Sequence, residues 1–348
     1  MTGQPIRLLI VDDSVVMRSL IERMFEACAD IEVASTAATT AQAFDFLAKE
    51  RVDVILLDHE MPGQKGLDAL PRFLAAAKGA HIIMLSSHCQ RGSETVVQAL
   101  SLGASDALPK PTGGQSIPVF AVQLAERLRR LAKSRQQTST PETHYNYRPF
   151  PVGFELQCIG VGASTGGIHT LGEFLGGKGP ERLGVPILLT QHLPEPFMPY
   201  YAQQVERMTD MPVSIAQSGQ RLEPDHIYIA PGDMSLLCHK RKDGVVIALT
   251  PEGDDIIRAR PSINLMFRSI ARCFGAGALG VVLTGIGRDG TSGAQAIVEA
   301  GGAVIAQDRA SSVIWGMPGS VTRAGFTSAN LRPEKMFEYI SHQAGARP

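Results

Sequence analysis

The stretch that decides the fold of this chain is Gly162-Ala163-Ser164-Thr165-Gly166-Gly167. A run of strand-forming residues over 156–161 leads into it, and a helical pattern over 168–175 follows it. A strand, a sharp glycine turn and a helix together lift a nucleophilic serine above the edge of a sheet. The glycines permit the tight turn and leave room for a substrate. The same pattern also suits a serine that only caps a helix, so the role of Ser164 depends on its surroundings.

The composition limits the class of protein. With 348 residues, the chain has room for roughly two domains. Its 44% hydrophobic and 19% charged residues are ordinary for a globular protein, and its net charge of -1 predicts no nucleic-acid partner. Five scattered cysteines without a C-x-x-C pair indicate a reducing compartment, so we expect a cytoplasmic protein. There is no signal-peptide pattern and no apolar run near the ~20 residues of a membrane span, so we expect no membrane insertion.

Residues 1–133 alternate between strand-like and helix-like stretches. Helical patterns follow the strands, beginning at Ser14 and ending with a stretch over 117–133. Five such units predict a doubly wound (βα)5 domain with a parallel sheet covered on both faces. The expected strands cover residues 6–11, 31–35, 52–57, 81–85 and 106–108.

Polar residues stand at the carboxyl ends of these strands, where functional groups gather in such a fold. They are Asp12, Asp13, Asp58, Ser86 and Lys110. Three carboxylates at one edge repel one another unless a cation binds, and hard oxygen ligands suit Mg²⁺. Each aspartate could instead be a helix cap or a turn residue. Five matching positions in order favour a site where a carboxylate accepts a phosphoryl group and a lysine and a hydroxyl hold its oxygens.

This domain resembles the receiver domain of bacterial response regulators. The matching residues are Asp12-Asp13, Asp58 followed by Met61-Pro62-Gly63, Ser86 and Lys110-Pro111. The resemblance implies that Asp58 is phosphorylated and that Ser86 and Lys110 contact the phosphoryl group. It also implies a Mg²⁺ site made of Asp12, Asp13, Asp58 and the carbonyl of Glu60.

Two positions depart from the receiver pattern. Ala107 stands where receivers usually carry a tyrosine or phenylalanine that swings inward on activation, which leaves the route of signal transmission open. Lys65 replaces a more common acidic residue. Residues 134–153 are polar and proline-containing with little periodicity, so we expect a linker there and a second domain over 154–348.

The second domain again alternates strand-like and helix-like stretches, and it predicts a second α/β parallel sheet. Its expected strands cover 156–161, 185–190, 225–230, 245–249, 280–284 and 303–306. Its expected helices cover 168–175, 200–208, 262–273 and 292–300.

Three strand ends of this domain carry Ser164, His192 and Asp289. A serine needs a base to attack at neutral pH, and the base needs an orienting acid. His169 is turned away on its helix and His226 precedes a strand, so His192 is the expected base. His192 could instead cap a turn, and Asp289 could be a turn residue in the glycine-rich loop over 285–290. Backbone N–H groups of that loop could also stabilise an oxyanion.

The second domain resembles the catalytic domain of the chemotaxis protein-glutamate methylesterase (CheB) family. With the receiver and the linker, the resemblance covers nearly the whole chain in order. The matching motifs are Ile159 to Gly167, Gln191-His192, Ile229-Ala230-Pro231-Gly232-Asp233, Arg260-Pro261-Ser262, Leu283 to Gly290 and Trp315-Gly316-Met317-Pro318.

The resemblance implies a Ser164–His192–Asp289 triad, with the backbone N–H of Ile286 in the oxyanion hole at a position usually held by methionine. It implies hydrolysis of γ-glutamyl methyl esters on chemoreceptors, with release of methanol, no cofactor for hydrolysis, and in some members deamidation of receptor glutamines. A chemotaxis histidine kinase would be the phosphodonor, and the unphosphorylated receiver would cover the cleft.

Two alternatives stay open from the sequence. One is a non-catalytic phosphorylation switch that docks on a partner through its second domain. The other is the same hydrolase acting on an unrelated ester or amide outside chemotaxis.

Overall fold

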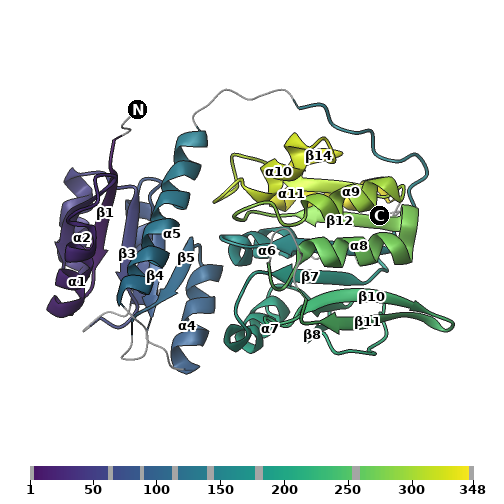
Figure 1. Cartoon of the computed structure of the whole chain (residues 1–348), viewed down its shortest axis with the longest axis horizontal. Coiled ribbons are helices and arrows are strands. Elements are labelled where there is room, and N and C mark those ends of the chain that lie inside the picture. The colour runs from purple at the N-terminus through teal and green to yellow at the C-terminus, as the bar shows by residue number, and fades with distance from the viewer. Residues whose placement is uncertain are drawn as a thin grey trace. The chain divides into compact units, whose positions relative to one another are not determined.

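The computed structural model describes residues 4–61, 66–86, 90–111, 117–138, 145–176, 183–252 and 259–344. The chain divides into two compact units, Met1–Thr140 and Pro141–Pro348. Each is an α/β unit built on a parallel sheet (Figure 1).

The first unit is the predicted (βα)5 domain. Its sheet has the order β2-β1-β3-β4-β5, with every pair parallel, so the expected fold class is confirmed. The strands are β1 (Ile6–Val11), β2 (Ile31–Ala37), β3 (Val54–Asp58), β4 (His81–Ser86) and β5 (Asp106–Pro109). The helices are α1 (Val15–Phe25), α2 (Thr40–Lys49), α3 (Gly66–Ala76), α4 (Gln90–Ser101) and α5 (Ile117–Thr138).

Local sequence signals account for where these elements begin. The Ser14 hydroxyl caps α1 by accepting the N–H of Met17, and Thr39 caps α2 by accepting the N–H of Gln42. Every residue of β3 is buried, as expected for a central strand with helices on both faces. Helix α5 continues to Thr138, beyond the predicted end at residue 133.

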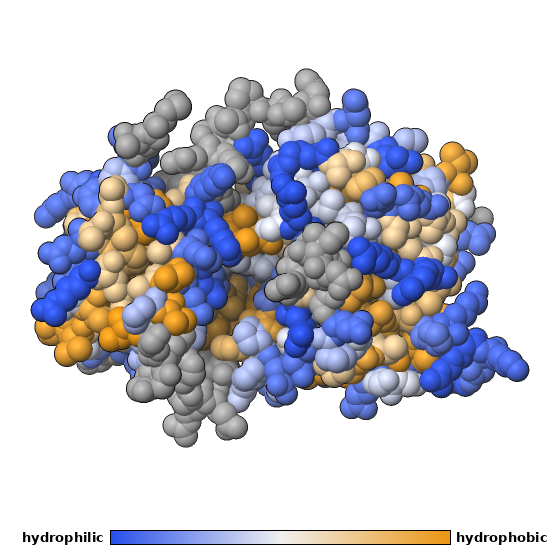
Figure 2. Space-filling view, in the orientation of Figure 1, coloured by the Kyte–Doolittle hydropathy of each residue, from blue (hydrophilic) through white to orange (hydrophobic). Residues whose placement is uncertain are grey.

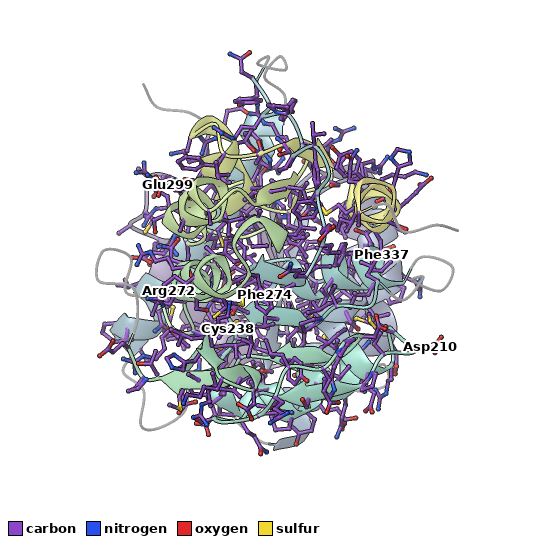
Figure 3. All side chains as sticks on the ribbon, turned by 90° about the vertical axis from the view of Figure 1, so that its right-hand side faces the viewer. Asp210, Cys238, Arg272, Phe274, Glu299 and Phe337 are labelled. Atoms are coloured by element: carbon purple, nitrogen blue, oxygen red, sulfur yellow. The ribbon has the colours of Figure 1, made fainter. Side chains whose placement is uncertain are left out.

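The second unit contains a seven-stranded parallel sheet of order β14-β13-β12-β6-β7-β9-β8. Its strands are β6 (Cys158–Ala163), β7 (Ile187–Gln191), β8 (Val213–Ile215), β9 (Ile227–Ile229), β12 (Ala278–Val282), β13 (Ala303–Gln307) and β14 (Ala329–Leu331). Its helices are α6 (Gly167–Leu175), α7 (Met198–Glu206), α8 (Ile263–Phe274), α9 (Thr291–Glu299), α10 (Met317–Arg323) and α11 (Pro333–Gln343), with 3-10 turns η1 (Glu195–Phe197) and η2 (Gly275–Gly277). Phe337 of α11, which is labelled in Figure 3, packs on Phe174 of α6. The ring centroids are 6.0 Å apart.

One strand expected in the parallel sheet lies elsewhere. Residues 245–249 belong to β11 (Gly244–Thr250), which pairs antiparallel with β10 (Ser235–Arg241) in a separate two-stranded sheet. Gly244, at a φ of 134°, turns the chain between the two strands. Figure 2 shows hydrophilic side chains gathered over the tip of this hairpin, where Lys240, Arg241, Lys242 and Asp243 are among the exposed residues. The short edge strands β8 and β14, three residues each, were not predicted, because so few half-buried residues carry little pattern.

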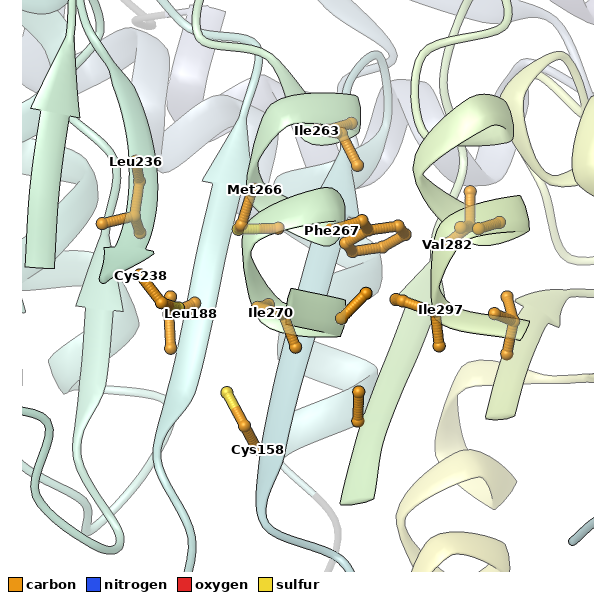
Figure 4. Packing of buried hydrophobic residues seen from close by; sticks show 14 of the residues in the cluster. Cys158, Leu188, Leu236, Cys238, Ile263, Met266, Phe267, Ile270, Val282 and Ile297 are labelled. Carbon is orange, nitrogen blue, oxygen red and sulfur yellow. The ribbon is translucent and has the colours of Figure 1, made fainter. Parts of the chain in front are cut away.

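Helix α8 packs directly on the centre of the large sheet because the strands beneath it carry glycines. A Cβ on Gly160 would lie 2.6 Å from Ile270 Cδ1, and one on Gly162 would lie 2.5 Å from Ile263 Cγ2. Figure 4 shows the ring of Phe267 directed from α8 toward Val282 of β12. The glycines of β6 therefore bring the N-terminus of α8 close to the carboxyl ends of the central strands.

Residues 145–153, expected in the linker, belong to the second unit and pack against the rest of it. Arg148 donates its N–H to the carbonyl of Thr327 at 2.9 Å, and the ring of Phe150 lies 5.9 Å from that of Tyr339. Residues 139–144 of the expected linker lie outside the described residues. Among the helices that the structure describes, none has both the length and the apolar character needed to cross a membrane.

Candidate active site and phosphoacceptor site

Ser164 is the first residue beyond β6, in the turn that leads into α6. The turn depends on Gly166, whose φ of 78° lies in the left-handed region and whose missing Cβ leaves room for Val313. The N–H of Ser164 donates to Thr284 at 3.0 Å, and its carbonyl accepts the N–H of Gly167 at 2.8 Å. These bonds hold a half-buried serine at the N-terminus of a helix, where developing negative charge is favoured.

His192 directly follows β7, the neighbour of β6 in the sheet. Its N–H donates to the carbonyl of Ala163 at 3.0 Å, so the two strand ends are tied together beside Ser164. Its Nε2 lies 2.9 Å from Oδ2 of Asp289, and its side chain is 20% exposed. The structure therefore brings together His192 and Asp289, which are 97 residues apart in the sequence.

Asp289 is almost fully buried, and the N-terminus of α8 supplies hydrogen bonds to it. Its carboxylate accepts the N–H groups of Ile263 at 2.8 Å and Asn264 at 3.0 Å, and the hydroxyl of Ser262 at 3.4 Å. The first turn of a helix has backbone N–H groups without partners inside the helix, and the Asp289 carboxylate accepts two of those of α8. The Arg260-Pro261-Ser262 motif had no expected role from the sequence. A serine before an apolar helical run is a cap signal that could have identified it.

The ring of His192 has a defined orientation. A carboxylate only accepts hydrogen bonds, so Nε2 carries the proton in the pair with Asp289, and Nδ1 is the nitrogen left with a lone pair. In the part of the chain that the structure describes, the Ser164 hydroxyl donates no hydrogen bond to His192. Such bonds commonly tighten only when substrate is bound.

The glycine-rich loop after β12 passes close to Ser164. A Cβ on Gly285 would lie 2.6 Å from the Ser164 Cβ, and Gly285 is held by Ile314 and Met317 through backbone bonds of 3.0 and 2.9 Å. Among the described residues, the N–H of Ile286 donates to no backbone oxygen. This N–H is therefore available to a ligand beside the serine.

Thr284 and Gln307 form a buried polar pair that the sequence did not identify. The pair supports the serine turn and the glycine-rich loop after β12. Thr284 donates through its hydroxyl to the Thr165 carbonyl at 3.0 Å and accepts the N–H of Ile314 at 2.9 Å. Its own N–H donates to Oε1 of Gln307 at 2.7 Å. Thr284 thus links the serine turn to the loop that carries Ile286.

In the first unit, Asp12, Asp13 and Asp58 form a cluster at the carboxyl ends of β1 and β3. One carboxylate oxygen from each lies within 4.8 Å of the others. Asp12 and Asp58 are buried, and Asp13 is exposed. Three hard oxygen donors at this spacing fit a Mg²⁺ ion, which prefers carboxylate ligands.

Lys110 bridges the two buried carboxylates. Its Nζ lies 2.9 Å from Oδ2 of Asp12 and 2.7 Å from Oδ2 of Asp58. Burial raises the pKa of Asp58 above its ordinary value, against the opposing effect of Lys110. Burial alone would lower the pKa of Lys110, but its hydrogen bonds to Asp58 and Asp12 leave that pKa raised. Lys110 therefore stays charged beside the carboxylate that we expect to be phosphorylated.

The remaining expected residues of this site lie around the cluster. Ser86 ends β4 and is buried, and its carbonyl accepts the N–H of Lys110 at 2.8 Å. The N–H of Glu60 donates to Oδ1 of Asp58 at 3.2 Å. Ala107 is half-buried in β5, opposite Met84 of β4. Pro62, Gly63 and Lys65 lie outside the described residues.

Comparison with known proteins assigns both units. Residues 159–340 match the family model of the CheB methylesterase, and residues 8–119 match that of the response regulator receiver domain. A "Protein-glutamate methylesterase/protein-glutamine glutaminase 2" of Caulobacter vibrioides is 37% identical over 97% of this chain and 99% of its own. A protein-glutamate methylesterase/protein-glutamine glutaminase of Azospirillum brasilense is 36% identical over 97% of this chain and 92% of its own.

Among solved structures, the CheB methylesterase catalytic domain of Thermotoga maritima is 31% identical to this chain, with a TM-score of 0.51. The match covers 54% of this chain and 98% of that domain. The two family matches follow one another along the chain, with the receiver match first. The chain belongs to the CheB methylesterase family, with an N-terminal response regulator receiver domain.

Proposed function

We propose that this protein is a phosphorylation-regulated protein-glutamate methylesterase that hydrolyses γ-glutamyl methyl esters on chemoreceptors during chemotactic adaptation. The observation that carries the proposal is the placement of three residues at one edge of the sheet, with a 2.9 Å contact between His192 and Asp289. Ser164 and His192 directly follow the adjacent strands β6 and β7, and Asp289 lies in the loop after β12, the other neighbour of β6. The names of the full-length relatives support the substrate class.

In this mechanism, Ser164 Oγ attacks the ester carbonyl carbon while His192 Nδ1 takes the hydroxyl proton. The carbonyl π bond opens, and the resulting oxyanion accepts the N–H of Ile286. When the tetrahedral intermediate collapses, the imidazolium returns the proton to the leaving methoxy oxygen, and methanol departs. Water then attacks the acyl-serine by the same route and releases the glutamate side chain and free Ser164.

Asp289 stabilises the imidazolium formed in both steps. Because the carboxylate is buried and hydrogen-bonded by the N-terminus of α8, its charge stays close to Nε2 with little reorganisation. An oxyanion-hole donor such as the Ile286 N–H is worth about 3 kcal/mol in the transition state.

A second activity fits the same site. Attack on a glutamine side chain would form the same acyl-serine with ammonia as the leaving group, and the relatives are also named protein-glutamine glutaminases. We include glutamine deamidation in the proposal because the acyl-serine that forms, and its hydrolysis by water, are the same for either leaving group.

The receiver unit would control this activity through phosphorylation of Asp58 by a chemotaxis histidine kinase. Lys110 would hold a phosphoryl oxygen through its Nζ, and Ser86 would supply a hydroxyl. Asp12, Asp13, Asp58 and the Glu60 carbonyl would hold Mg²⁺, which when bound there offsets the negative charge of the phosphodonor. The unphosphorylated receiver would cover the catalytic cleft.

The test is release of methanol from membranes that carry methylated chemoreceptors, with ammonia release from glutamine-containing receptors in a second arm. Wild-type protein should release methanol, and Ser164→Ala should reduce the rate by several orders of magnitude while the circular dichroism spectrum is unchanged. Ser164→Ala activity within tenfold of wild type would remove Ser164 as the nucleophile. A wild-type protein without activity on either receptor form would favour the non-catalytic switch or another ester.

A further inference from the structure

Gln191 is the last residue of β7 and directly precedes His192, and no step of the mechanism above uses it. Its side chain is buried, with 3% of the residue exposed. In the sheet, Gln191 lies opposite Ala163, so its side chain stands beside the point where β6 ends and the serine turn begins. There its Nε2 donates a hydrogen bond to the carbonyl oxygen of Ser164 at 2.9 Å.

This bond joins the strand of the expected base to the peptide of the expected nucleophile. The Ser164 carbonyl accepts one bond from Gly167, inside its own turn, and one from Gln191, outside it. The bond from Gly167 shapes the turn, but both of its partners lie in the turn, so it does not fix the position of the turn relative to β7. The Gln191 bond relates the turn to the strand that carries His192, so it influences where Ser164 Oγ stands relative to the imidazole.

The oxygen of the Gln191 amide indicates that this side chain does more than stabilise the fold. Oε1 is buried and accepts no hydrogen bond from the described residues. A Cβ on Gly167 would lie only 2.5 Å from it, so a glycine there makes room for the amide. Turning the amide over would place Oε1 against the Ser164 carbonyl, and two acceptors repel each other. An apolar side chain of similar size would avoid the unpaired acceptor.

We propose that Gln191 is a positioning residue, which holds the Ser164 turn in register with His192 through its bond to the Ser164 carbonyl. The inference rests on the proposed triad of Ser164, His192 and Asp289. It concerns the rate of serine attack and not the binding of substrate, since the Gln191 side chain is buried beneath the turn.

The experiment compares full-length Gln191→Leu with wild type under identical phosphorylating conditions. Three quantities are measured: kcat and KM for methanol release, the rate at which a fluorophosphonate labels Ser164, and Tm. We expect kcat and the labelling rate to fall about 10- to 100-fold, since small displacements of reacting groups have effects of that size. KM should change little. Tm should be unchanged or higher, because the Ser164 carbonyl keeps its Gly167 partner while the unpaired Oε1 is removed.

Gln191→Glu supplies a pH signature that a packing role would not produce. An ionised glutamate offers the Ser164 carbonyl only acceptors, whereas a protonated one can donate its O–H. The labelling rate of Gln191→Glu, divided by that of wild type at the same pH, should therefore rise as the pH falls. Dividing by wild type removes the pH effects that the two proteins have in common.

Two further variants separate the possible outcomes. Gln295→Leu, an exposed glutamine on α9, should match wild type in every measurement. Ser164→Ala should be neither active nor labelled, and if it is labelled, the proposed triad fails together with this inference. If Ser164→Ala is inactive and unlabelled, the role of Gln191 can be overturned by itself. A wild-type kcat in Gln191→Leu would overturn it, and so would a loss of kcat that is accompanied by a lowered Tm. A labelling rate of Gln191→Glu, relative to wild type, that does not change with pH would also overturn it.

Discussion

Oδ2 of Asp289 lies 2.9 Å from Nε2 of His192, and the same oxygen accepts the backbone N–H of Ile263 at 2.8 Å. The imidazole and the first turn of α8 therefore share one carboxylate oxygen. Since α8 is packed onto glycines of the central strands, its position is set by the core of the domain, and the orientation of His192 follows from it.

The first prediction concerns this carboxylate. Asp289→Asn should reduce kcat for methanol release by about 10²- to 10⁴-fold, which is a smaller loss than for Ser164→Ala, because the nucleophile and the oxyanion hole remain. The amide would present an NH₂ group where the carboxylate accepts several N–H donors, so the imidazole would lose its orientation. Asp243→Asn is a matched control, because that exposed aspartate pairs only with Arg221 on the surface among the described residues. Activity of Asp289→Asn equal to that of the control would contradict the proposed role.

The second prediction concerns phosphorylation of Asp58. Labelling by acetyl phosphate should require Mg²⁺, because Asp12 and Asp13 bring two further carboxylates to within 4.8 Å of the acceptor oxygen and would repel the donor. Labelling should be lost in Asp58→Asn and restored in wild type when Mg²⁺ is added after chelation. Phosphate incorporation that survives both a chelator and Asp58→Asn would place the acceptor elsewhere.

The third prediction follows from the direction of the Asp58 pKa. Burial raises this pKa in the folded state above its ordinary value of 3.8, so the folded protein holds a proton on Asp58 more readily than the unfolded chain does. The ionised group therefore costs stability at neutral pH, and this cost disappears as the pH falls through the raised pKa toward 3.8.

Asp58→Asn, measured without Mg²⁺, should accordingly raise the Tm of the receiver transition at pH 7 by a few degrees. The difference from wild type should narrow as the pH is lowered. Lys110 keeps its contact with Asp12 at 2.9 Å in the variant, so it is not left unpaired. Calorimetry of the full chain at several pH values provides the comparison. A lower Tm for Asp58→Asn than for wild type at pH 7 would contradict the prediction, because it would show that the ion pair with Lys110 stabilises the folded protein by more than the burial of the Asp58 charge destabilises it.

The fourth prediction concerns the receiver as an inhibitor. A folded unit attached by a short linker stays near its partner at high effective concentration, so a weak contact can cover the cleft, and phosphorylation needs to shift that equilibrium by only a few kcal/mol. A truncated chain beginning at Tyr145 should therefore release methanol faster than the unphosphorylated full chain. An equal or lower rate from a truncated chain that is folded by circular dichroism would show that the receiver does not inhibit.

The structure also decides where that truncation should begin. Tyr145 packs on Trp315 with ring centroids 5.6 Å apart, and Phe150 packs on Tyr339. A chain beginning at Phe154, the expected domain boundary, would lose both contacts. We expect it to have a lower Tm than the chain that begins at Tyr145.

Much of the fold and of the candidate site could be predicted because the signals are local. In a parallel sheet, the residue after each strand lies at the same edge, so Asp58, Ser86 and Lys110 in one unit and Ser164 and His192 in the other could be placed from strand patterns alone. The separate β10–β11 hairpin could not be predicted, since a strand pattern does not state which sheet the strand joins.

The sequence by itself determined which residues stand at the strand ends and in what order, because strand periodicity and glycine turns are properties of neighbouring residues. Only the tertiary structure decided what each of them faces. That Nε2 of His192 meets Asp289, that α8 donates to Asp289 and that Gln191 donates to Ser164 depend on contacts between residues 97, 26 and 27 positions apart. Such contacts arise from the packing of helices and strands, which carries no local signature in the chain.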